Sequence, residues 1–337
     1  MSRLEALYAR AARAAVPVEV MLELTHHCNF RCRHCYIPDF LVPDALSTER
    51  VLELLEELAE MGTLVVALSG GEIFLRRDWH PIAARARELG FELHLFSNAF
   101  LVDEGTADAI AGLEATMQVS LYTMEADRFD AIVRRPGAFT RVVEGIERLR
   151  ERDVRVILKV PLMTLNRGSL PAIQAYAASI GAECRSSPTI TARKDGDTTP
   201  LGLRLAPDEA FGELGGPLAI GCFPERAPDG PLCAAASRYC CITATGDVMA
   251  CNILPGSGGN VRERRFREIW EDSPWLREVR GIRAQDLAEC GGCSRLSYCG
   301  RCHAQALVED GSLYGPSTHA RLRAELVESR DGLAAGS

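Results

Sequence analysis

The sequence Cys28-Asn29-Phe30-Arg31-Cys32-Arg33-His34-Cys35 places three thiols at spacings of four and three residues, so that they can converge on one inorganic centre. Three thiolates fill only part of a tetrahedral zinc site or of an iron-sulfur cube, and an open metal position usually indicates chemistry. A zinc site completed by His26, His27 or His34 fits the same spacing. The stretch therefore predicts a metal centre and leaves zinc and iron-sulfur chemistry open.

Composition and charge narrow the class of protein. The 337 residues are 47% hydrophobic and 25% charged, which is ordinary for a globular protein with one large α/β domain and a smaller module. The formal net charge of -8 and the lack of a basic run argue against a nucleic-acid partner. We find no export signal and no apolar run of about 18 residues, so we expect a cytoplasmic protein without a membrane partner.

Cysteine usage points to metal binding. In a reducing compartment, the 13 cysteines are better interpreted as metal ligands than as disulfides, because their number is odd and they cluster. All but one fall in two groups near the ends of the chain. Only Cys184 stands apart, and we expect it to be a small buried apolar residue.

Apolar strands alternate with helical patterns over the first half of the chain. After a leading helix at residues 2–15, we expect strands at 18–24, 63–68, 91–96, 116–121, 154–160 and 182–186, and helices at 49–61, 78–89, 107–113, 139–152 and 169–180. This alternation predicts a parallel sheet covered by helices, either doubly wound or curved into a barrel. Residues 188–231 are rich in Gly, Pro and Asp and indicate a linker.

Chemically suggestive residues follow the strands, where parallel α/β folds place their sites. The cysteine loop follows the first strand, Gly70-Gly71-Glu72 the second and Ser97-Asn98 the third, and Ser120 ends the fourth. Glycines permit close backbone approach, and a carboxylate at this edge can accept a hydrogen bond from a cationic amino group. A tight turn with a surface glutamate is the alternative interpretation of the same tripeptide.

These ordered motifs, CxxxCxxC at 28–35 and Gly-Gly-Glu at 70–72, resemble the radical S-adenosylmethionine (radical SAM) enzymes. The resemblance covers nearly the whole chain and implies an α/β fold with a partial (β/α)6 TIM-like barrel. It implies a [4Fe–4S] cluster on Cys28, Cys32 and Cys35, whose fourth iron binds the amino and carboxylate groups of S-adenosylmethionine. Reductive cleavage would then give a 5'-deoxyadenosyl radical that abstracts hydrogen from a substrate.

The resemblance also implies a set of residues around S-adenosylmethionine. These are Tyr36, Gly70, Gly71, Glu72, Ser97, Asn98, Ser120 and Arg134. A surface salt bridge for Arg134, a strand-end cap for Ser97 and plain packing for Tyr36 are the structural alternatives.

The C-terminal cysteines resemble a SPASM domain, an extension that carries one or two auxiliary iron-sulfur clusters in many of these enzymes. The thiols concerned are Cys233, Cys240, Cys241, Cys251, Cys290, Cys293, Cys299 and Cys302. In the SPASM pattern, Cys233, Cys251 and Cys302, with Cys240 or Cys241, would hold one cluster, and Cys290, Cys293 and Cys299 the other. Residues 261–270 resemble the family's intervening helix. Paired CxxC knuckles are also frequent zinc ligands, although the five residues between these two knuckles are fewer than usual.

One departure concerns the second auxiliary cluster. The family usually supplies a further cysteine downstream, but none follows Cys302, and Arg321 stands in that region. The alternatives are a ligand from His319, Asp310 or Cys222, an open iron, or the absence of this cluster. The expected domains are the barrel at 1–187, a linker at 188–231, the SPASM domain at 232–325 and a tail at 326–337.

The resemblance implies an enzyme that modifies a peptide, as in the maturation of ribosomal peptides or peptide-derived cofactors. A separate recognition protein could present the peptide, and flavodoxin or ferredoxin could supply the electron. Modification of a tetrapyrrole or another small molecule is the runner-up. Sulfatase maturation fits less well, because Asn252 stands where those relatives have a carboxylate base. A non-catalytic zinc or iron-sulfur scaffold is the alternative from a different class.

Overall fold

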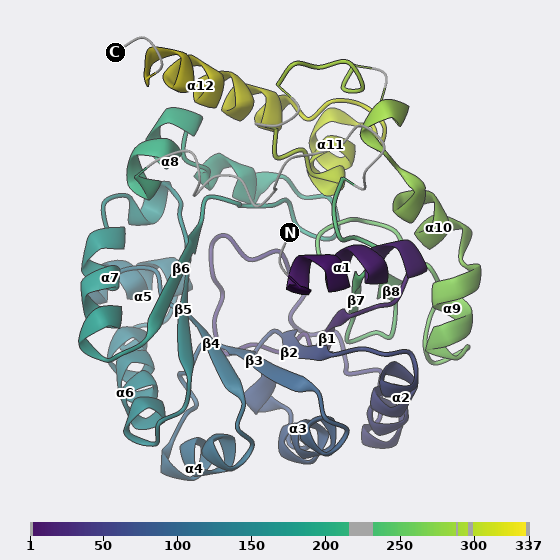
Figure 1. The fold of residues 1–337 in the computed structure, drawn as a ribbon. Helices are drawn as coiled ribbons and strands as arrows, with labels where there is room; N and C mark the ends of the chain where they lie inside the picture. Colours follow the sequence, from purple (N-terminus) through teal and green to yellow (C-terminus); the bar gives the residue numbers. More distant parts are fainter. Residues whose placement is uncertain (1–2, 216–231, 288, 296–298, 335–337) are drawn as a thin grey trace.

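The computed structural model of the protein describes residues 3–215, 232–287, 289–295 and 299–334. It contains one sheet with the strand order β6-β5-β4-β3-β2-β1-β7-β8. The first six strands are parallel and follow one another around the sheet. They are β1 (Glu19–Thr25), β2 (Val65–Gly70), β3 (Glu92–Ser97), β4 (Thr116–Ser120), β5 (Val156–Pro161) and β6 (Glu183–Ser187). The predicted partial barrel is confirmed, and Figure 1 shows its strands curving around a central space.

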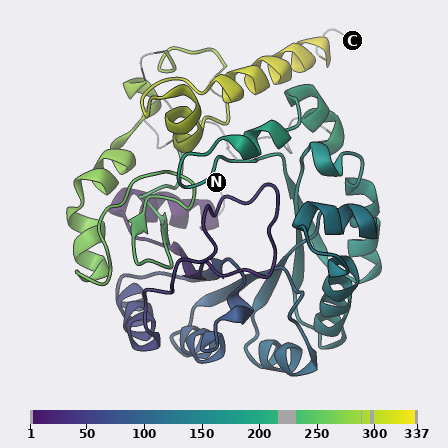
Figure 2. The same cartoon turned by 180° about the vertical axis from the view of Figure 1, so that it is seen from behind.

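Helices cover the outer face of the curved sheet, as Figure 2 shows from behind. They are α2 (Thr48–Glu60), α3 (Trp79–Glu88), α4 (Glu104–Gly112), α5 (Ala126–Val133), α6 (Ala138–Glu151) and α7 (Leu170–Ser179). Two of them begin with a polar side-chain cap, since the side chain of Ser47 accepts from Arg50 N at the start of α2 and that of Asp103 accepts from Thr106 N at the start of α4. The short α5 is the one helix of this layer that the sequence pattern does not predict.

The core lies between the sheet and these helices. Along β1, Val20, Leu22 and Leu24 alternate with other residues and are at most 1% exposed. Alternate residues of a strand point to opposite faces, so these three face the helices. Met21 and Glu23 consequently face the inside of the barrel, toward the central space.

The C-terminal part extends the same sheet. Strand β7 (Tyr239–Ile242) pairs in parallel with β1, and β8 (Val248–Met249) pairs antiparallel with β7. The sequence pattern does not predict this hairpin, because its pairing partner lies more than 200 residues upstream. The cysteine-rich region is therefore joined by backbone hydrogen bonds to the strand that precedes the first cysteine loop.

Further helices complete this end of the molecule. They are α1 (Arg3–Ala14), α8 (Pro207–Leu214), α9 (Phe266–Asp272), α10 (Pro274–Gly281), α11 (His303–Asp310) and α12 (Thr318–Ala334). Helix α8 and a 3-10 helix at Thr199–Leu203 lie in the expected linker. Helix α9 falls on the expected intervening helix, and α12 runs through residue 325, where we expect a domain boundary.

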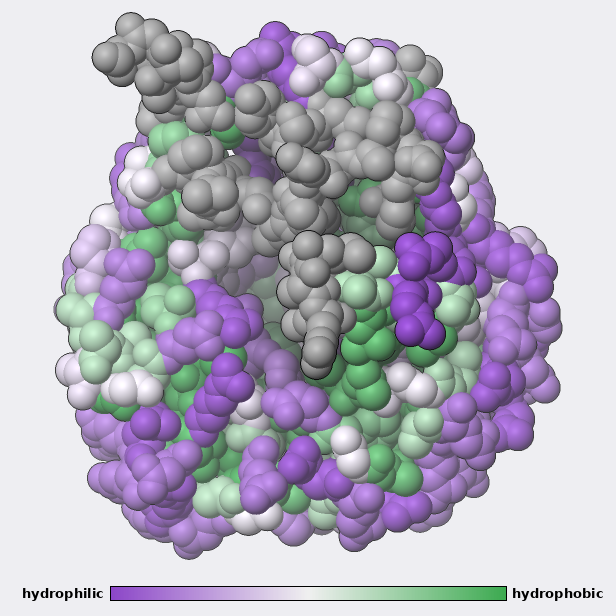
Figure 3. All heavy atoms as spheres, in the orientation of Figure 1, coloured by the Kyte–Doolittle hydropathy of each residue, from purple (hydrophilic) through white to green (hydrophobic). Residues whose placement is uncertain are grey.

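The surface is hydrophilic along its outer rim. In Figure 3, hydrophilic side chains dominate the lower and right edges, where α2, α3 and α9 lie, and hydrophobic ones appear toward the centre of this face. Within the described ranges, no helix combines the length and apolar character needed to cross a membrane.

Two glycines allow the ends of β1 and β2 to meet. A β-carbon on Gly70 would lie 2.2 Å from the carbonyl oxygen of Thr25, and one on Gly71 would lie 2.2 Å from that of His27. In this space, Gly71 N donates to Thr25 O at 2.7 Å and Glu72 N donates to His27 O at 2.8 Å. Gly70 also has a φ of +129°, which side chains other than hydrogen rarely permit. The glycines thus fix where the cysteine loop leaves β1.

We expect Gly71→Ala to displace the cysteine loop, because a backbone oxygen cannot rotate away from the new methyl group. The free energy of unfolding should fall by about 3 kcal/mol, and iron bound by the loop should be lost. Gly112→Ala is the matched control, since nothing lies within 4 Å of its position at the end of α4. It should leave both quantities unchanged or raise stability by up to ~1 kcal/mol. Urea denaturation and iron analysis measure the two effects, and wild-type behaviour of Gly71→Ala would contradict the prediction.

Candidate active site

A cavity of about 250 Å³ lies at the carboxyl ends of the strands and brings together most of the expected site residues. Those that line it are Cys28, Cys32, Cys35, Tyr36, Gly70, Gly71, Ser97, Asn98 and Ser120. The ends of three strands, β2, β3 and β4, and the cysteine loop thus contribute to one space. Two expected members, Glu72 and Arg134, lie outside the lining.

Backbone hydrogen bonds hold the cysteine loop against α5. Arg31 N donates to Val133 O at 3.0 Å, and Arg33 N donates to Ile132 O at 3.1 Å. Phe30 N points at the sulfur of Cys28 at 3.4 Å. The loop therefore has a fixed conformation in which its thiols face the cavity.

Burial sets the protonation of these thiols. It raises the pKa of Cys28 to about 12 and also raises the pKa of Cys32 and of Cys35. Thiols in such surroundings are protonated at neutral pH unless a cation compensates the thiolate charge. They are suited to bind metal and are poor free nucleophiles.

Glu72 joins the ends of β2 and β3. Its carboxylate is fully buried and accepts from Phe74 N at 3.2 Å, from Ser97 Oγ at 2.8 Å and from Asn98 N at 2.8 Å. Burial raises the pKa of Glu72 to about 7, although the hydrogen bonds oppose this shift. Protein donors thus already occupy the carboxylate that the resemblance assigns to S-adenosylmethionine.

Asn98 connects Glu72 to the cysteine loop. Its side-chain nitrogen donates to Asn29 Oδ1 at 2.8 Å and lies 3.9 Å from the sulfur of Cys28. A chain of polar contacts therefore links Glu72 to the first thiol.

Arg134 and its neighbour Arg135 have different surroundings. Arg134 ends α5 in the left-handed conformation, with a φ of 57°, and its side chain is exposed. Arg135 donates to Asn29 O at 2.9 Å and places its guanidinium 4.1 Å from the centre of the Phe100 ring. The arginine that contacts the cysteine loop is therefore Arg135, which the sequence analysis does not single out.

A buried ion pair lies inside the barrel beside Tyr36. The Nζ atom of Lys194 is 2.7 and 2.6 Å from the two carboxylate oxygens of Glu23, which is fully buried. Tyr36 donates its hydroxyl to Glu23 at 3.0 Å, and His26 lies 3.6 Å from the same carboxylate. Burial acts to raise the pKa of Glu23, but His26 and Lys194 together hold it below its ordinary value. Lys194 belongs to the expected linker, so this segment is fastened over the cysteine loop.

Tyr122 and Asn252 also line the cavity, although neither belongs to the expected set around S-adenosylmethionine. Tyr122 has its hydroxyl 3.9 Å from the sulfur of Cys32, and Asn252 comes from the C-terminal part. The side chain of Asn252 accepts from the hydroxyl of Tyr239 at 3.2 Å. Its position directly after Cys251 was the available signal, but only the pairing of β7 with β1 brings this segment to the barrel.

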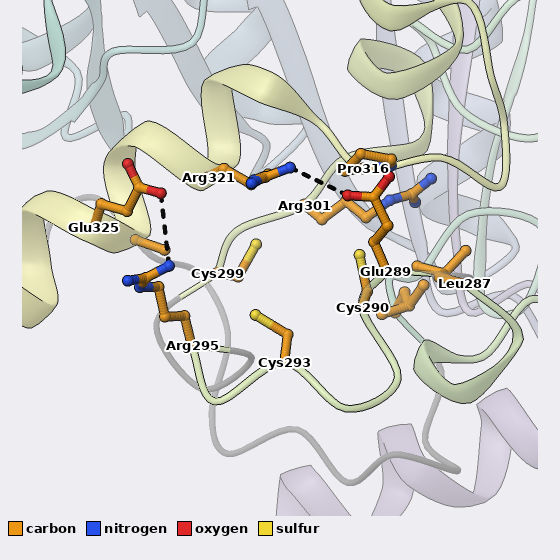
Figure 4. Close-up of a pocket in the computed structure, with 12 residues that line it drawn as sticks. Leu287, Glu289, Cys290, Cys293, Arg295, Cys299, Arg301, Pro316, Arg321 and Glu325 are labelled. Carbon is orange, nitrogen blue, oxygen red and sulfur yellow. Dashed lines mark hydrogen bonds and ion pairs between the residues drawn. The ribbon is translucent and has the colours of Figure 1, made fainter.

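A second cavity, of about 110 Å³, lies in the C-terminal part. Figure 4 shows the sulfurs of Cys290, Cys293 and Cys299 directed into it. Cys290 interacts electrostatically with both of the other thiols. The three thiols that the SPASM pattern groups together are therefore neighbours.

Cys251 is the centre of the other C-terminal group. Its thiolate would interact with those of Cys302 and Cys233, and burial raises the pKa of Cys251 to about 12. Cys240 and Cys241 are adjacent on β7 and so point to opposite faces. Cys240 packs in the hydrophobic core, whereas Cys241 interacts with Glu23, Lys194 and Cys251. Of the two, Cys241 is the one on the side of Cys251.

The alternative fourth ligands are placed as follows. Asp310 accepts hydrogen bonds from the backbone nitrogen and hydroxyl of Thr318. His319 interacts with Arg204, Arg323 and Glu309, and it does not line the second cavity. Arg321 does line this cavity and pairs with Glu289 at 3.2 Å. Cys222 lies outside the described residues.

The thiols line the two cavities and do not converge on the position of a single metal ion. Among the side chains that the structure describes, no group of three or more His, Cys, Asp or Glu is spaced to hold a single metal ion. The first cavity offers three thiols on one wall and glycine backbone and hydroxyl groups on another. This donor set fits a multinuclear sulfur-ligated centre beside a small polar molecule.

We expect Lys194→Met to destabilise the protein strongly, because it leaves the buried Glu23 carboxylate without its cation. The free energy of unfolding should fall by about 3–5 kcal/mol, and the double variant Glu23→Gln/Lys194→Met should recover much of this loss. Arg185→Met is the control, since it removes an exposed pair with Glu183 and should cost less than about 1 kcal/mol. Urea denaturation under anaerobic conditions measures all three, and equal costs for Lys194→Met and Arg185→Met would refute the prediction.

His319 gives a prediction for pH. Burial, with the charges of Arg204 and Arg323, lowers the pKa of His319 to about 4 from 6.5. Below pH 6.5 the unfolded chain therefore binds a proton that the folded chain does not. The free energy of unfolding consequently decreases as the pH is lowered. From pH 7.5 to 5.5, wild type should lose about 1 kcal/mol more than His319→Gln, measured by denaturation at each pH. The variant should keep its full iron content, and iron loss would identify His319 as a ligand.

Two family models match the chain in the expected order. A model of the radical SAM superfamily matches residues 22–170, and a model of the SPASM iron-sulfur cluster-binding domain matches residues 233–303. The first match contains the loop thiols and the residues after β2, β3 and β4. The second begins at Cys233 and ends directly after Cys302.

Relatives extend the similarity over most of the chain. An AdoMet-dependent heme synthase of Methanosarcina barkeri (strain Fusaro / DSM 804) is 26% identical over 334 residues, covering 89% of this chain and 95% of the relative. A PqqA peptide cyclase of Xanthomonas euvesicatoria pv. vesicatoria (strain 85-10) is 29% identical over 342 residues, covering 92% and 91%. The fold matches Streptococcus suis SuiB bound to S-adenosylmethionine with a TM-score of 0.75 at 16% identity, covering 91% of this chain and 78% of SuiB. The chain thus belongs to the radical SAM superfamily of enzymes, with iron-sulfur clusters and S-adenosylmethionine as cofactors, and carries a C-terminal SPASM domain.

Proposed function

We propose that this radical SAM enzyme modifies a peptide at the first cavity. The observation that carries the proposal is the convergence of Cys28, Cys32 and Cys35 with the glycine backbone of β2 and the polar ends of β3 and β4. A cluster and S-adenosylmethionine held by these residues would supply the radical chemistry needed to abstract hydrogen from a substrate.

Different residues of the chain would hold the cluster and S-adenosylmethionine. The three loop thiols would bind the cluster, and the backbone of Gly70 and Gly71 would lie along the methionine part of S-adenosylmethionine. Asn98 and Ser120 present polar groups to the same cavity. Glu72 supports this wall indirectly, because it holds Ser97 and the backbone of Asn98 in place. Arg134 is exposed and would reach the cosubstrate only by a change of conformation.

The substrate would approach from the side of the C-terminal part. Asn252 lines the cavity from there, and its amide is oriented by the hydroxyl of Tyr239. An amide hydrogen-bonds a substrate but is a poor base, so any proton lost with the abstracted hydrogen would need another acceptor. This favours chemistry other than the carboxylate-assisted oxidation of sulfatase maturation.

Two observations support a peptide as the substrate. Several relatives at 28–29% identity are PqqA peptide cyclases. In addition, β6 forms one edge of the sheet, with polar residues such as Glu183 and Arg185 on it, and extended peptides can bind by adding a strand to such an edge. A recognition protein for the peptide and an electron donor such as flavodoxin or ferredoxin belong to this proposal.

A tetrapyrrole substrate is the second candidate. The observation in its favour is the 26% identity to AdoMet-dependent heme synthases over 330 and 334 residues. Incubation with reductant, S-adenosylmethionine and either a peptide encoded beside the gene or a tetrapyrrole separates the two. A mass change in the peptide supports the proposal, and a change in the tetrapyrrole alone overturns it.

We expect the triple variant Cys28→Ala/Cys32→Ala/Cys35→Ala to lose formation of 5'-deoxyadenosine completely, because no other described thiol lines the first cavity. Iron and sulfide bound by the C-terminal cysteines should remain after anaerobic reconstitution. Cys184→Ala is the matched control, since this isolated thiol lies on β6 and should affect neither quantity. Unchanged cleavage in the triple variant, or a colourless wild-type protein loaded with zinc, would overturn the assignment.

A further inference from the structure

Arg301 is a buried cation at the second cavity. Its side chain is only 2% exposed, although it carries a guanidinium that stays protonated at any ordinary pH. Its hydrogen bonds go to Gly315 O at 2.9 and 2.7 Å, to Leu313 O at 2.5 Å and to His303 Nδ1 at 2.8 Å. Backbone carbonyls and an imidazole nitrogen orient the group, but none of these partners neutralises its charge.

The other arginines of this cavity contrast with Arg301. Arg321 and Arg295 lie at its rim and are paired with carboxylates, Arg321 with Glu289 at 3.2 Å and Arg295 with Glu328 at 2.5 Å. Figure 4 shows Arg321 with Glu289 on one side of the thiols and Arg295 with a second carboxylate, Glu325, on the other. Among the described residues, no carboxylate forms an ion pair with Arg301. Burying a charge without a counter-charge is costly, so this guanidinium is expected to have an anionic partner in the working enzyme.

The position of Arg301 identifies that partner. It lines the second cavity together with Cys290, Cys293 and Cys299, and it directly precedes Cys302. As thiolates, Cys290 and Cys299 of one trio and Cys302 and Cys233 of the other would interact with its guanidinium. One cation is thus close to both C-terminal sets of thiols.

We propose that Arg301 compensates the negative charge of both auxiliary clusters and thereby raises their reduction potentials. This inference rests on the proposed function, because it requires the two trios to hold iron-sulfur clusters. The reduction potential of such a cluster depends on net charge, on nearby charges and on burial. A fixed positive charge stabilises the reduced state, which carries one more electron. Arg301 therefore makes the auxiliary clusters better acceptors for an electron leaving a substrate radical.

A purely structural role is the competing explanation. Because Arg301 bonds the carbonyls of Leu313 and Gly315, it could serve only to hold that turn beside the thiols. Two substitutions separate the roles. Arg301→Lys keeps the charge and loses the fork of hydrogen bonds, whereas Arg301→Gln loses the charge and keeps some hydrogen-bonding capacity.

The experiment is a reductive titration of the iron-loaded full-length protein, followed by electron paramagnetic resonance. The cluster whose signal changes when S-adenosylmethionine is added serves as an internal reference. In Arg301→Gln, the equilibrium constant for reducing the auxiliary clusters should fall at least tenfold, which is 59 mV for one electron. Arg301→Lys should stay close to wild type, and so should Arg321→Gln, which removes a charge from the exposed rim of the same cavity. The reference cluster should not shift.

Each result bears on the inference. Loss of C-terminal iron in Arg301→Gln but not in Arg301→Lys would support charge compensation as well. Unchanged potentials in Arg301→Gln with full iron, or equal losses in both variants, would overturn it. If the triple variant at Cys28, Cys32 and Cys35 contained no iron, the C-terminal cysteines would hold no clusters. That result would refute the auxiliary clusters, and it is distinct from a failure of the role proposed for Arg301.

Discussion

The approach of the Gly70–Gly71 backbone to the backbone before the cysteine loop is the contact on which the rest of the site depends. Two hydrogen bonds, Gly71 N to Thr25 O and Glu72 N to His27 O, close a gap that a β-carbon would fill. Because the two segments end adjacent parallel strands, their contact fixes the point from which the loop departs. The glycines thus permit close contact between two segments of the protein itself. The backbone of the same glycines also lines the first cavity.

Glu72 extends this constraint to the next strand. A buried carboxylate needs hydrogen-bond donors, and Ser97 and the backbone of Asn98 supply them from the end of β3. Asn98 in turn reaches Asn29 and the sulfur of Cys28. Three strand ends and the first thiol are therefore positioned by one polar network. Because its carboxylate is fully buried and accepts three hydrogen bonds from the protein, Glu72 acts as a positioning residue.

Sequence patterns predicted the elements whose burial is continuous. Strands β1 to β5 are largely apolar runs covered by helices, whereas β6 is a polar edge strand, and the predicted positions of all six lie within two residues of the observed ones. Nine of the eleven expected barrel site residues line one cavity, because they all follow strands. Sequence patterns did not predict the features that depend on contacts between segments far apart in the chain. The pairing of β7 with β1 brings Asn252 to the barrel and places Cys240 and Cys241 on opposite faces of the sheet. The left-handed conformation of Arg134 ends α5, and Arg135 rather than Arg134 contacts the loop.

The shared strand β1 explains how the two parts of the molecule act as one. On one edge it pairs with β2, which shapes the wall of the first cavity, and on the other it pairs with β7 of the cysteine-rich part. The side chain of Glu23 on β1 points into the barrel and binds Lys194. This ion pair attaches residues 188–215 to β1. A displacement of the C-terminal part would disturb β1 and so the departure point of the cysteine loop. Since backbone pairing on both edges resists such displacement, Asn252 and the loop thiols keep a fixed relation, as a short-lived radical and its substrate require.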